Sequence, residues 1–119
     1  NPIARNEDGG MDHAVETSFG EMIQDWLPEA HVVKAFNALS FATMADPSSA
    51  GGLVTIPIAG NDDTAKASVA SLIEGIGFEV VDVGPIRFAH EIEGLLVLWI
   101  NARASGSPFN YYLRPVEGG

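Results

Sequence analysis

The sequence predicts an α/β protein with a parallel or mixed sheet and flanking helices. Three apolar runs have the length of strands, at 31–36, 53–59 and 78–83. Apolar residues recur at helical spacing in two longer segments, at 64–75 and 87–104. Because strands alternate with helices along the chain, we expect one sheet whose strands are joined by helical segments.

The amino-terminal part predicts a loop followed by a short helix. Residues 1–17 are polar and contain Gly9 and Gly10, so we expect a loop there. Ser18 and Glu21 have the spacing of a capping box, which predicts the start of a helix. This helix should end at Pro28, because proline lacks the N–H that a helix needs.

The first two strands enclose a loop of functional type. The run 31–36 leads directly into polar residues, which indicates a buried parallel strand that ends at a ligand site. Residues 38–52 predict a loop with one helical turn. Pro57 lies within the second run, and this favours an edge position or a bulge for that strand.

Acidic residues precede the clearest helix. Asp62 and Asp63 could be mistaken for a metal or general-base pair, but capping of the helix 64–75 explains them better. We expect a glycine stop at 75–77. The buried stripe of the helix is predicted to consist of Ala65, Val69, Leu72, Ile73 and Ile76.

The last helix is apolar on every side over residues 95–100. Such a helix must be covered by a large core or by a partner, so we expect a homodimer through residues 91–104. Gly106 and Pro108 should end the helix. We expect a final strand at 109–113, in which the two tyrosines face opposite sides, and a carboxyl-terminal tail.

The composition excludes several classes of partner. Six basic residues against sixteen acidic ones give a net charge of -10, which argues against nucleic acid and anionic membranes. The apolar run 95–100 is far shorter than the ~20 residues that span a bilayer. The absence of cysteine excludes disulfides and fits a cytoplasmic protein. The three histidines show no metal-ligand spacing, so no metal site is expected.

Three motifs, in order, resemble one family of oxidoreductases. They are Val-Val-Lys-Ala-Phe-Asn at 32–37, Ala-Gly-Asn-Asp-Asp at 59–63, and Gly-Phe-Glu-Val-Val-Asp-Val-Gly-Pro at 77–85. The chain is similar in these motifs to the NADPH-dependent coenzyme F420 reductases. The same motifs occur in the related oxidoreductase domain of six-transmembrane metalloreductases.

The resemblance implies the carboxyl-terminal portion of a Rossmann-type fold. The family transfers a hydride between NADP(H) and coenzyme F420, and its amino-terminal part binds NADP through a glycine-rich turn. No G-x-G-x-x-G motif occurs in this chain. By resemblance, residues 1–17 form a loop at the truncated edge of the dinucleotide domain, and residues 18–119 form an acceptor-binding domain.

The resemblance also implies a set of cofactor-binding residues. Asn1 and Pro2 would border the nicotinamide of NADP. Asn37, Ala38, Leu39 and Ser40 would lie against the acceptor ring. Gly106, Ser107 and Phe109 would form the outer wall of the acceptor site. Some relatives that use deazaflavins have histidine at the position of Asn37, so the resemblance leaves the acceptor open between coenzyme F420, a flavin and another compound.

Other readings of these residues stay open. Asn37 could simply cap the loop after its strand. Lys34 is expected to face solvent or to be paired internally, and Asp82 is expected to act in a turn. No catalytic acid or base is predicted, because hydride transfer between two stacked rings needs none. The alternative to the enzyme hypothesis is a non-catalytic α/β module that dimerises through its apolar last helix.

Overall fold

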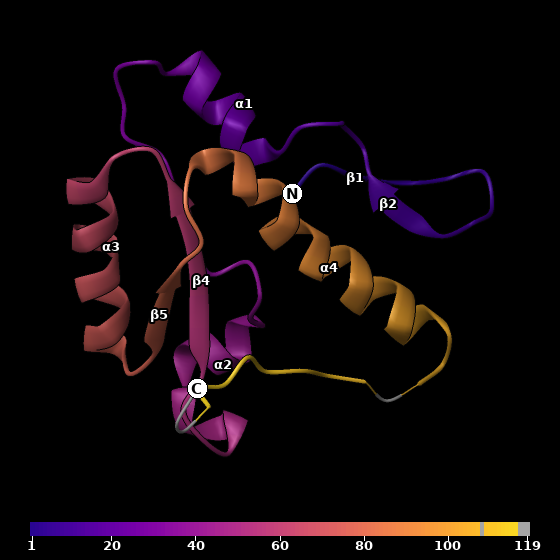
Figure 1. Ribbon diagram of the computed structural model, residues 1–119. Helices are drawn as coiled ribbons and strands as arrows, with labels where there is room; N and C mark the ends of the chain where they lie inside the picture. Colours follow the sequence, from indigo (N-terminus) through magenta and orange to yellow (C-terminus); the bar gives the residue numbers. More distant parts are fainter. Residues whose placement is uncertain (108, 117–119) are drawn as a thin grey trace.

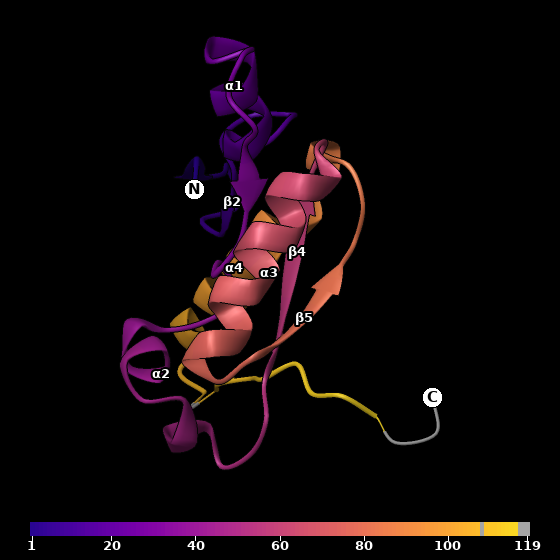
Figure 2. The ribbon, with the colours of Figure 1, turned by 90° about the vertical axis from the view of Figure 1, so that its left-hand side faces the viewer.

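A mixed sheet lies between two long helices in the computed structural model, which describes residues 1–107 and 109–116 (Figure 1). Over these residues the strand order is β3 (Val33–Lys34), β4 (Thr55–Gly60) and β5 (Glu79–Asp82). Helix α3 (Asp63–Ile76) covers one face and α4 (Ala89–Ala104) the other, as the two perpendicular views agree (Figure 2). The predicted α/β class with a mixed sheet and flanking helices is confirmed.

The first strand differs from its prediction. It is short, half-buried and antiparallel to β4, with Lys34 opposite Ala59, so the expected buried parallel strand at 31–36 is wrong. The connection to β4 contains only the short helix α2 (Phe41–Ala45) and the 3-10 helix η1 (Pro47–Ala50).

Pro57 lies in the central strand, so the expected edge position is wrong. The backbone N–H and C=O groups of residues 54, 56 and 58 point toward β5, as shown by the hydrogen bonds from the Glu79 N–H to the Val54 carbonyl and from the Val83 N–H to the Ile58 carbonyl. The backbone of Pro57 therefore points toward β3, which pairs only with residues 59 and 60. The missing N–H costs no ladder hydrogen bond there.

Asp62 is the N-cap of helix α3, and its carboxylate accepts a hydrogen bond from the Ala65 N–H at 2.8 Å, which confirms the capping role. Gly77 is the C-cap of this helix, and its φ is 116°. Its buried face is not the predicted stripe, because Leu72 and Ile76 are exposed. Ile73 is buried, as expected, but the face also contains a lysine at position 66.

Lys66 is buried because its ammonium reaches the edge of the sheet. Its Nζ lies 2.9 Å from Asp82 Oδ2, and this hydrogen bond raises the pKa of Lys66 and lowers the pKa of Asp82. Asp82 also accepts a hydrogen bond from the Gly84 N–H at 2.9 Å. The predicted turn role of Asp82 is therefore confirmed.

Helix α1 (Phe19–Trp26) forms as predicted from its capping box. The Ser18 hydroxyl accepts from the Glu21 N–H at 3.1 Å and donates to Glu21 Oε2 at 2.8 Å. Gly20 lies against the start of α4, where an added Cβ would come within 2.8 Å of the Ala89 Cβ. The missing side chain at position 20 therefore allows the two helices to approach closely.

Residues 1–17 contain a hairpin rather than the expected loop. Strands β1 (Ile3–Arg5) and β2 (Met11–His13) pair antiparallel, and β2 lies along α4 (Figure 1). The Asn101 side chain both accepts from the Met11 N–H at 2.8 Å and donates to the Met11 carbonyl at 2.7 Å. The sequence could not reveal this hairpin, because a contact with a residue 90 positions away holds it in place.

The carboxyl-terminal segment is extended but forms no strand over its described residues, so the strand expected at 109–113 is wrong. One backbone hydrogen bond, from the Thr55 N–H to the Leu113 carbonyl at 2.8 Å, joins it to the start of β4. The Arg114 guanidinium adds hydrogen bonds to the Ala50 and Leu53 carbonyls. Pro108 and the tail residues 117–119 lie outside the described residues. Within the described residues, no helix has both the length and the apolar character that crossing a bilayer requires.

A pair of glycine substitutions tests the close packing of α1 on α4. We expect Gly20→Ala to lower the free energy of unfolding by about 1–2 kcal/mol, because the new methyl group overlaps Ala89. Gly75→Ala is the matched control in α3, where no atom lies within 4 Å of an added Cβ. It should stabilise the chain by about 0.5–1 kcal/mol through helix propensity. Urea unfolding measures both, and equal effects of the two substitutions would contradict the packing argument.

Candidate functional site

A cavity of about 260 Å³ opens between the loop after β3, helix α4 and the carboxyl-terminal segment. Four consecutive residues singled out by the resemblance line it, namely Asn37, Ala38, Leu39 and Ser40. The other lining residues are Phe41, Leu96, Trp99, Asn110 and Tyr111. Segments far apart in the sequence thus meet at one hollow.

The loop reaches the cavity through an unusual backbone turn. Phe36 has φ 61°, and it is the one non-glycine residue with a positive φ in the described part of the chain. The left-handed region disfavours bulky side chains, so this conformation must be held by its surroundings. Phe36 packs against the core cluster around Ile56 and Ile58. Core packing therefore sets the direction in which Asn37 leaves the strand.

Helix α4 provides the aromatic wall. Leu96 and Trp99 are three residues apart and so share a face of the helix. The Arg103 guanidinium lies 5.0 Å from the centre of the Trp99 ring and also donates to the Phe109 carbonyl at 3.3 Å. Arg103 therefore contacts the indole from the carboxyl-terminal end of α4.

Tyr111 closes the cavity from the carboxyl-terminal segment. Its hydroxyl donates to the Leu95 carbonyl at 3.2 Å, and burial raises the pKa of its phenol above the ordinary value of 10.0. The predicted alternation of the two tyrosines holds in part. Tyr111 faces the cavity, whereas Tyr112 packs against the core rather than facing solvent.

The cavity lining carries no formal charge. Its residues are apolar, aromatic, hydroxyl or carboxamide, with the amides of Asn37 and Asn110 as its strongest hydrogen-bonding groups. Such a lining suits a flat, neutral ring that needs a few oriented hydrogen bonds. It contains no carboxylate, imidazole or amine for proton transfer.

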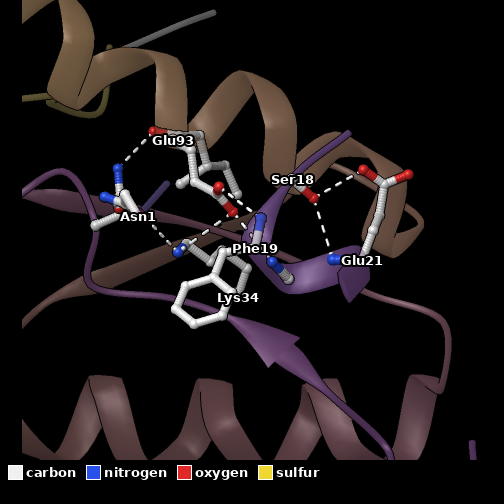
Figure 3. A network of polar contacts seen from close by, with 9 residues as sticks. Asn1, Ser18, Phe19, Glu21, Lys34 and Glu93 are labelled. Atoms are coloured by element: carbon white, nitrogen blue, oxygen red, sulfur yellow. Dashed lines mark hydrogen bonds and ion pairs between the residues drawn. The ribbon is translucent and has the colours of Figure 1, made fainter. Parts of the chain in front are cut away.

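Polar contacts connect Asn37 with Asn1, Lys34 and Glu93, of which Figure 3 labels the last three. The Asn37 amide donates to the Ile92 carbonyl at 2.7 Å and accepts a hydrogen bond from the Asn1 amide. The Asn1 oxygen accepts from Lys34 Nζ at 2.6 Å. Lys34 is paired with Glu93, as its Nζ lies 3.4 Å from Glu93 Oε2, so the expected internal pairing of this lysine is confirmed.

The other predicted site residues lie outside the cavity lining. Asn1 reaches it through its contact with Asn37, whereas Pro2 is outside the lining and accepts a backbone hydrogen bond from Ala14. Gly106 and Ser107 are exposed beyond the end of α4. Phe109 is not in the lining either, but its ring centre lies 5.9 Å from that of Tyr111.

Sequence reasoning missed the aromatic and amide part of the wall. The sequence places Trp99 in the core or in an interface, and it indicates no role in the site for Phe41, Leu96 or Asn110. A signal existed for Leu96 and Trp99, since their three-residue spacing places them on one face of the apolar helix. No signal existed for Asn110, because only the folded path of the carboxyl-terminal segment brings it to the cavity.

Solved structures show which proteins this fold resembles. No protein-family model matches the chain. A crystal structure from Arthrobacter sp. FB24, described as a "putative f420 dependent nadp-reductase", matches with 36% identity and a TM-score of 0.83 over 98% of this chain. The hypothetical protein SMa0349 from Sinorhizobium meliloti matches with 28% identity and a TM-score of 0.59 over 97% of this chain.

The chain spans about half of each of these proteins, 55% of the first and 48% of the second. In sequence and in fold it is similar to the coenzyme F420-dependent NADP reductases, as the three motifs predicted.

The buried phenol of Tyr111 gives a titration that tests the closed cavity. We expect the tyrosinate absorbance that Tyr111→Phe removes from the folded chain to appear at a higher pH than the absorbance that it removes from the unfolded chain. The unfolded chain releases this proton first, so the free energy of unfolding should fall as pH rises above about 10. The same midpoint for this difference in the folded chain and in denaturant would contradict the burial of this phenol.

Proposed function

We propose that this chain is the acceptor-binding part of an NADP-dependent oxidoreductase that transfers a hydride between NADP(H) and coenzyme F420 or a flavin. One observation carries the proposal. The loop that follows the Val-Val-Lys-Ala-Phe-Asn motif lines an uncharged cavity whose other walls are aromatic. The similarity to a protein described as an F420-dependent NADP reductase supports the same class of reaction.

The size of the cavity favours one ring system. Its volume of about 260 Å³ lies just below the roughly 300–1,000 Å³ of pockets that enclose whole drug-sized ligands. A flat ring can lie between the loop and Trp99, while the rest of the cofactor extends into solvent. Flavins and deazaflavins both consist of such a ring with a long polar substituent.

Asn37 supplies the hydrogen bonds that would orient the ring. Its amide uses one hydrogen on Ile92 and one lone pair on Asn1, which leaves one donor and one acceptor. The pyrimidine edge of a flavin or deazaflavin presents carbonyl and N–H groups side by side. This edge is complementary to a single carboxamide.

The remaining predicted residues take outer positions in this proposal. Asn1 and Pro2 border the nicotinamide of NADP, next to the amide pair of Asn1 and Asn37. Phe109 supports the acceptor wall through Tyr111, and Gly106 and Ser107 form the turn beyond it. Residues 1–17 belong to the dinucleotide side and residues 18–119 to the acceptor side.

Transfer itself depends on geometry. Two rings must stack at reacting distance with water kept out, and the small side chain of Ala38 permits close approach. The bound nicotinamide and acceptor supply the redox chemistry. The chain orients the acceptor and shields it from solvent.

Fluorescence titration with FMN and with coenzyme F420 tests this function. Either ring should quench Trp99, so quenching should persist in Trp26→Phe and disappear in Trp99→Phe. Trp26 is the matched control because it is 63% exposed and lies outside the cavity lining. Quenching that follows Trp26 instead of Trp99 would place the ligand elsewhere.

Asn37→Ala should weaken acceptor binding about tenfold, because both ring hydrogen bonds are lost. It should lower the free energy of unfolding by only about 1 kcal/mol, through the lost bond to Ile92. Asn6→Ala, outside the cavity lining, is the matched control and should leave affinity unchanged. If wild type binds neither ring, the proposed function is wrong.

The alternative function is a non-catalytic module that dimerises through α4, although dimerisation by itself is also compatible with the enzyme. The chain itself half-covers most of α4, but Leu98 is 55% exposed. We propose that a second copy covers this face, in a cytoplasmic homodimer. Light scattering should give twice the chain mass at micromolar concentration, and Leu98→Lys should give the monomer. A monomeric wild type would overturn the dimer and leave the acceptor site unaffected.

A further inference from the structure

The polar contacts behind the cavity have a fixed direction, which a cation that only donates sets at one end and a carbonyl that only accepts sets at the other. The Lys34 ammonium can only donate hydrogen bonds, so Asn1 must turn its oxygen toward Lys34, at 2.6 Å. The nitrogen of Asn1 then points at the Asn37 oxygen. Asn37 in turn directs its nitrogen to the Ile92 carbonyl at 2.7 Å. Figure 3 shows Lys34, Asn1 and Glu93 in this arrangement.

Glu93 holds the lysine in place. Its side chain is 1% exposed and its Oε2 lies 3.4 Å from Lys34 Nζ. The same carboxylate accepts from the Phe19 N–H at 2.8 Å and the Gly20 N–H at 3.2 Å. The ammonium therefore faces a carboxylate that is itself fixed by the first turn of α1. Only 16% of the Lys34 side chain is exposed, whereas Asn1 is exposed to solvent.

We propose that Lys34 is a positioning residue for the acceptor site. It does not line the cavity. Its charge orders the Asn1 amide, and through it the Asn37 amide, so that the cavity presents one donor and one acceptor in fixed places. Without the charge, Asn1 loses the contact that holds it against Asn37, and the Asn37 amide then keeps only its bond to the Ile92 carbonyl and no longer holds one position. This inference rests on the proposed function for its effect on ligand binding, but the orientation of Asn37 can be measured without a ligand.

Lys34→Met tests the proposal, because methionine keeps an unbranched side chain and removes the charge. The amide signals of Asn37 Nδ2 in ¹H–¹⁵N spectra should shift or broaden, since the amide loses its single orientation. Affinity for FMN should fall about tenfold. Lys34→Arg should restore both readouts, because arginine keeps a donor-only cation. Lys66→Met is the matched control, because Lys66 is also a largely buried lysine in an ion pair but lies outside the cavity lining.

The double variant Lys34→Met with Asn37→Ala separates positioning from general stability. If Lys34 acts through Asn37, the double variant should bind FMN no more weakly than Asn37→Ala alone. Additive losses would overturn the proposal. Because Lys34→Met leaves the Glu93 carboxylate without its cation, Lys34→Met with Glu93→Gln is the second variant if the first fails to fold. Its Asn37 signals should shift in the same way.

The two proposals fail in different ways. If wild type binds neither FMN nor coenzyme F420, the proposed function is wrong, and the Asn37 signals still decide the role of Lys34. The positioning role is overturned, whatever the affinities are, if the Asn37 signals of wild type are unchanged in Lys34→Met and in Lys34→Met with Glu93→Gln. Signals that move equally in Lys66→Met would also overturn it, because the change would then report general loosening.

Discussion

The carboxylate of Glu93 is the contact on which the arrangement of the molecule depends. It lies in the amino-terminal part of α4, and it binds the first two N–H groups of α1 and the ammonium of Lys34 on β3. Three elements from different parts of the chain therefore meet at one buried group. Loss of one partner from a buried ion pair typically costs about 3–5 kcal/mol, because the remaining charge stays uncompensated. The geometry of α1, β3 and α4 is thus coupled.

Local chemistry made much of the fold predictable. Ser18 with Glu21, and Asp62 before α3, are signals that act within four residues, and both helices begin where these signals predict. Errors arose where distant contacts decide the structure. The hairpin of residues 1–17 depends on Asn101, and the buried position of Lys66 depends on Asp82. Neither contact can be read from the nearby sequence.

The candidate site shows the same division. The resemblance led to residues 37–40, which form one continuous stretch of the cavity lining. Trp99 and Tyr111 belong to the opposite walls, and their places follow from the packing of α4 and the path of the last residues. The positive φ of Phe36 was also invisible in the sequence, because phenylalanine rarely adopts it without support from the core. A motif can thus mark one wall of a cavity, while packing determines the others.

The carboxyl-terminal segment is the most weakly attached wall of the cavity. Few bonds hold this segment, chiefly the Thr55–Leu113 backbone bond, the Arg114 contacts and the Tyr111 hydroxyl. The opposite walls belong to α4 and to a loop anchored by the core. Outward displacement of residues 109–112 therefore disturbs the least structure. The entrance can widen on this side for rings of different breadth while the sheet remains unchanged.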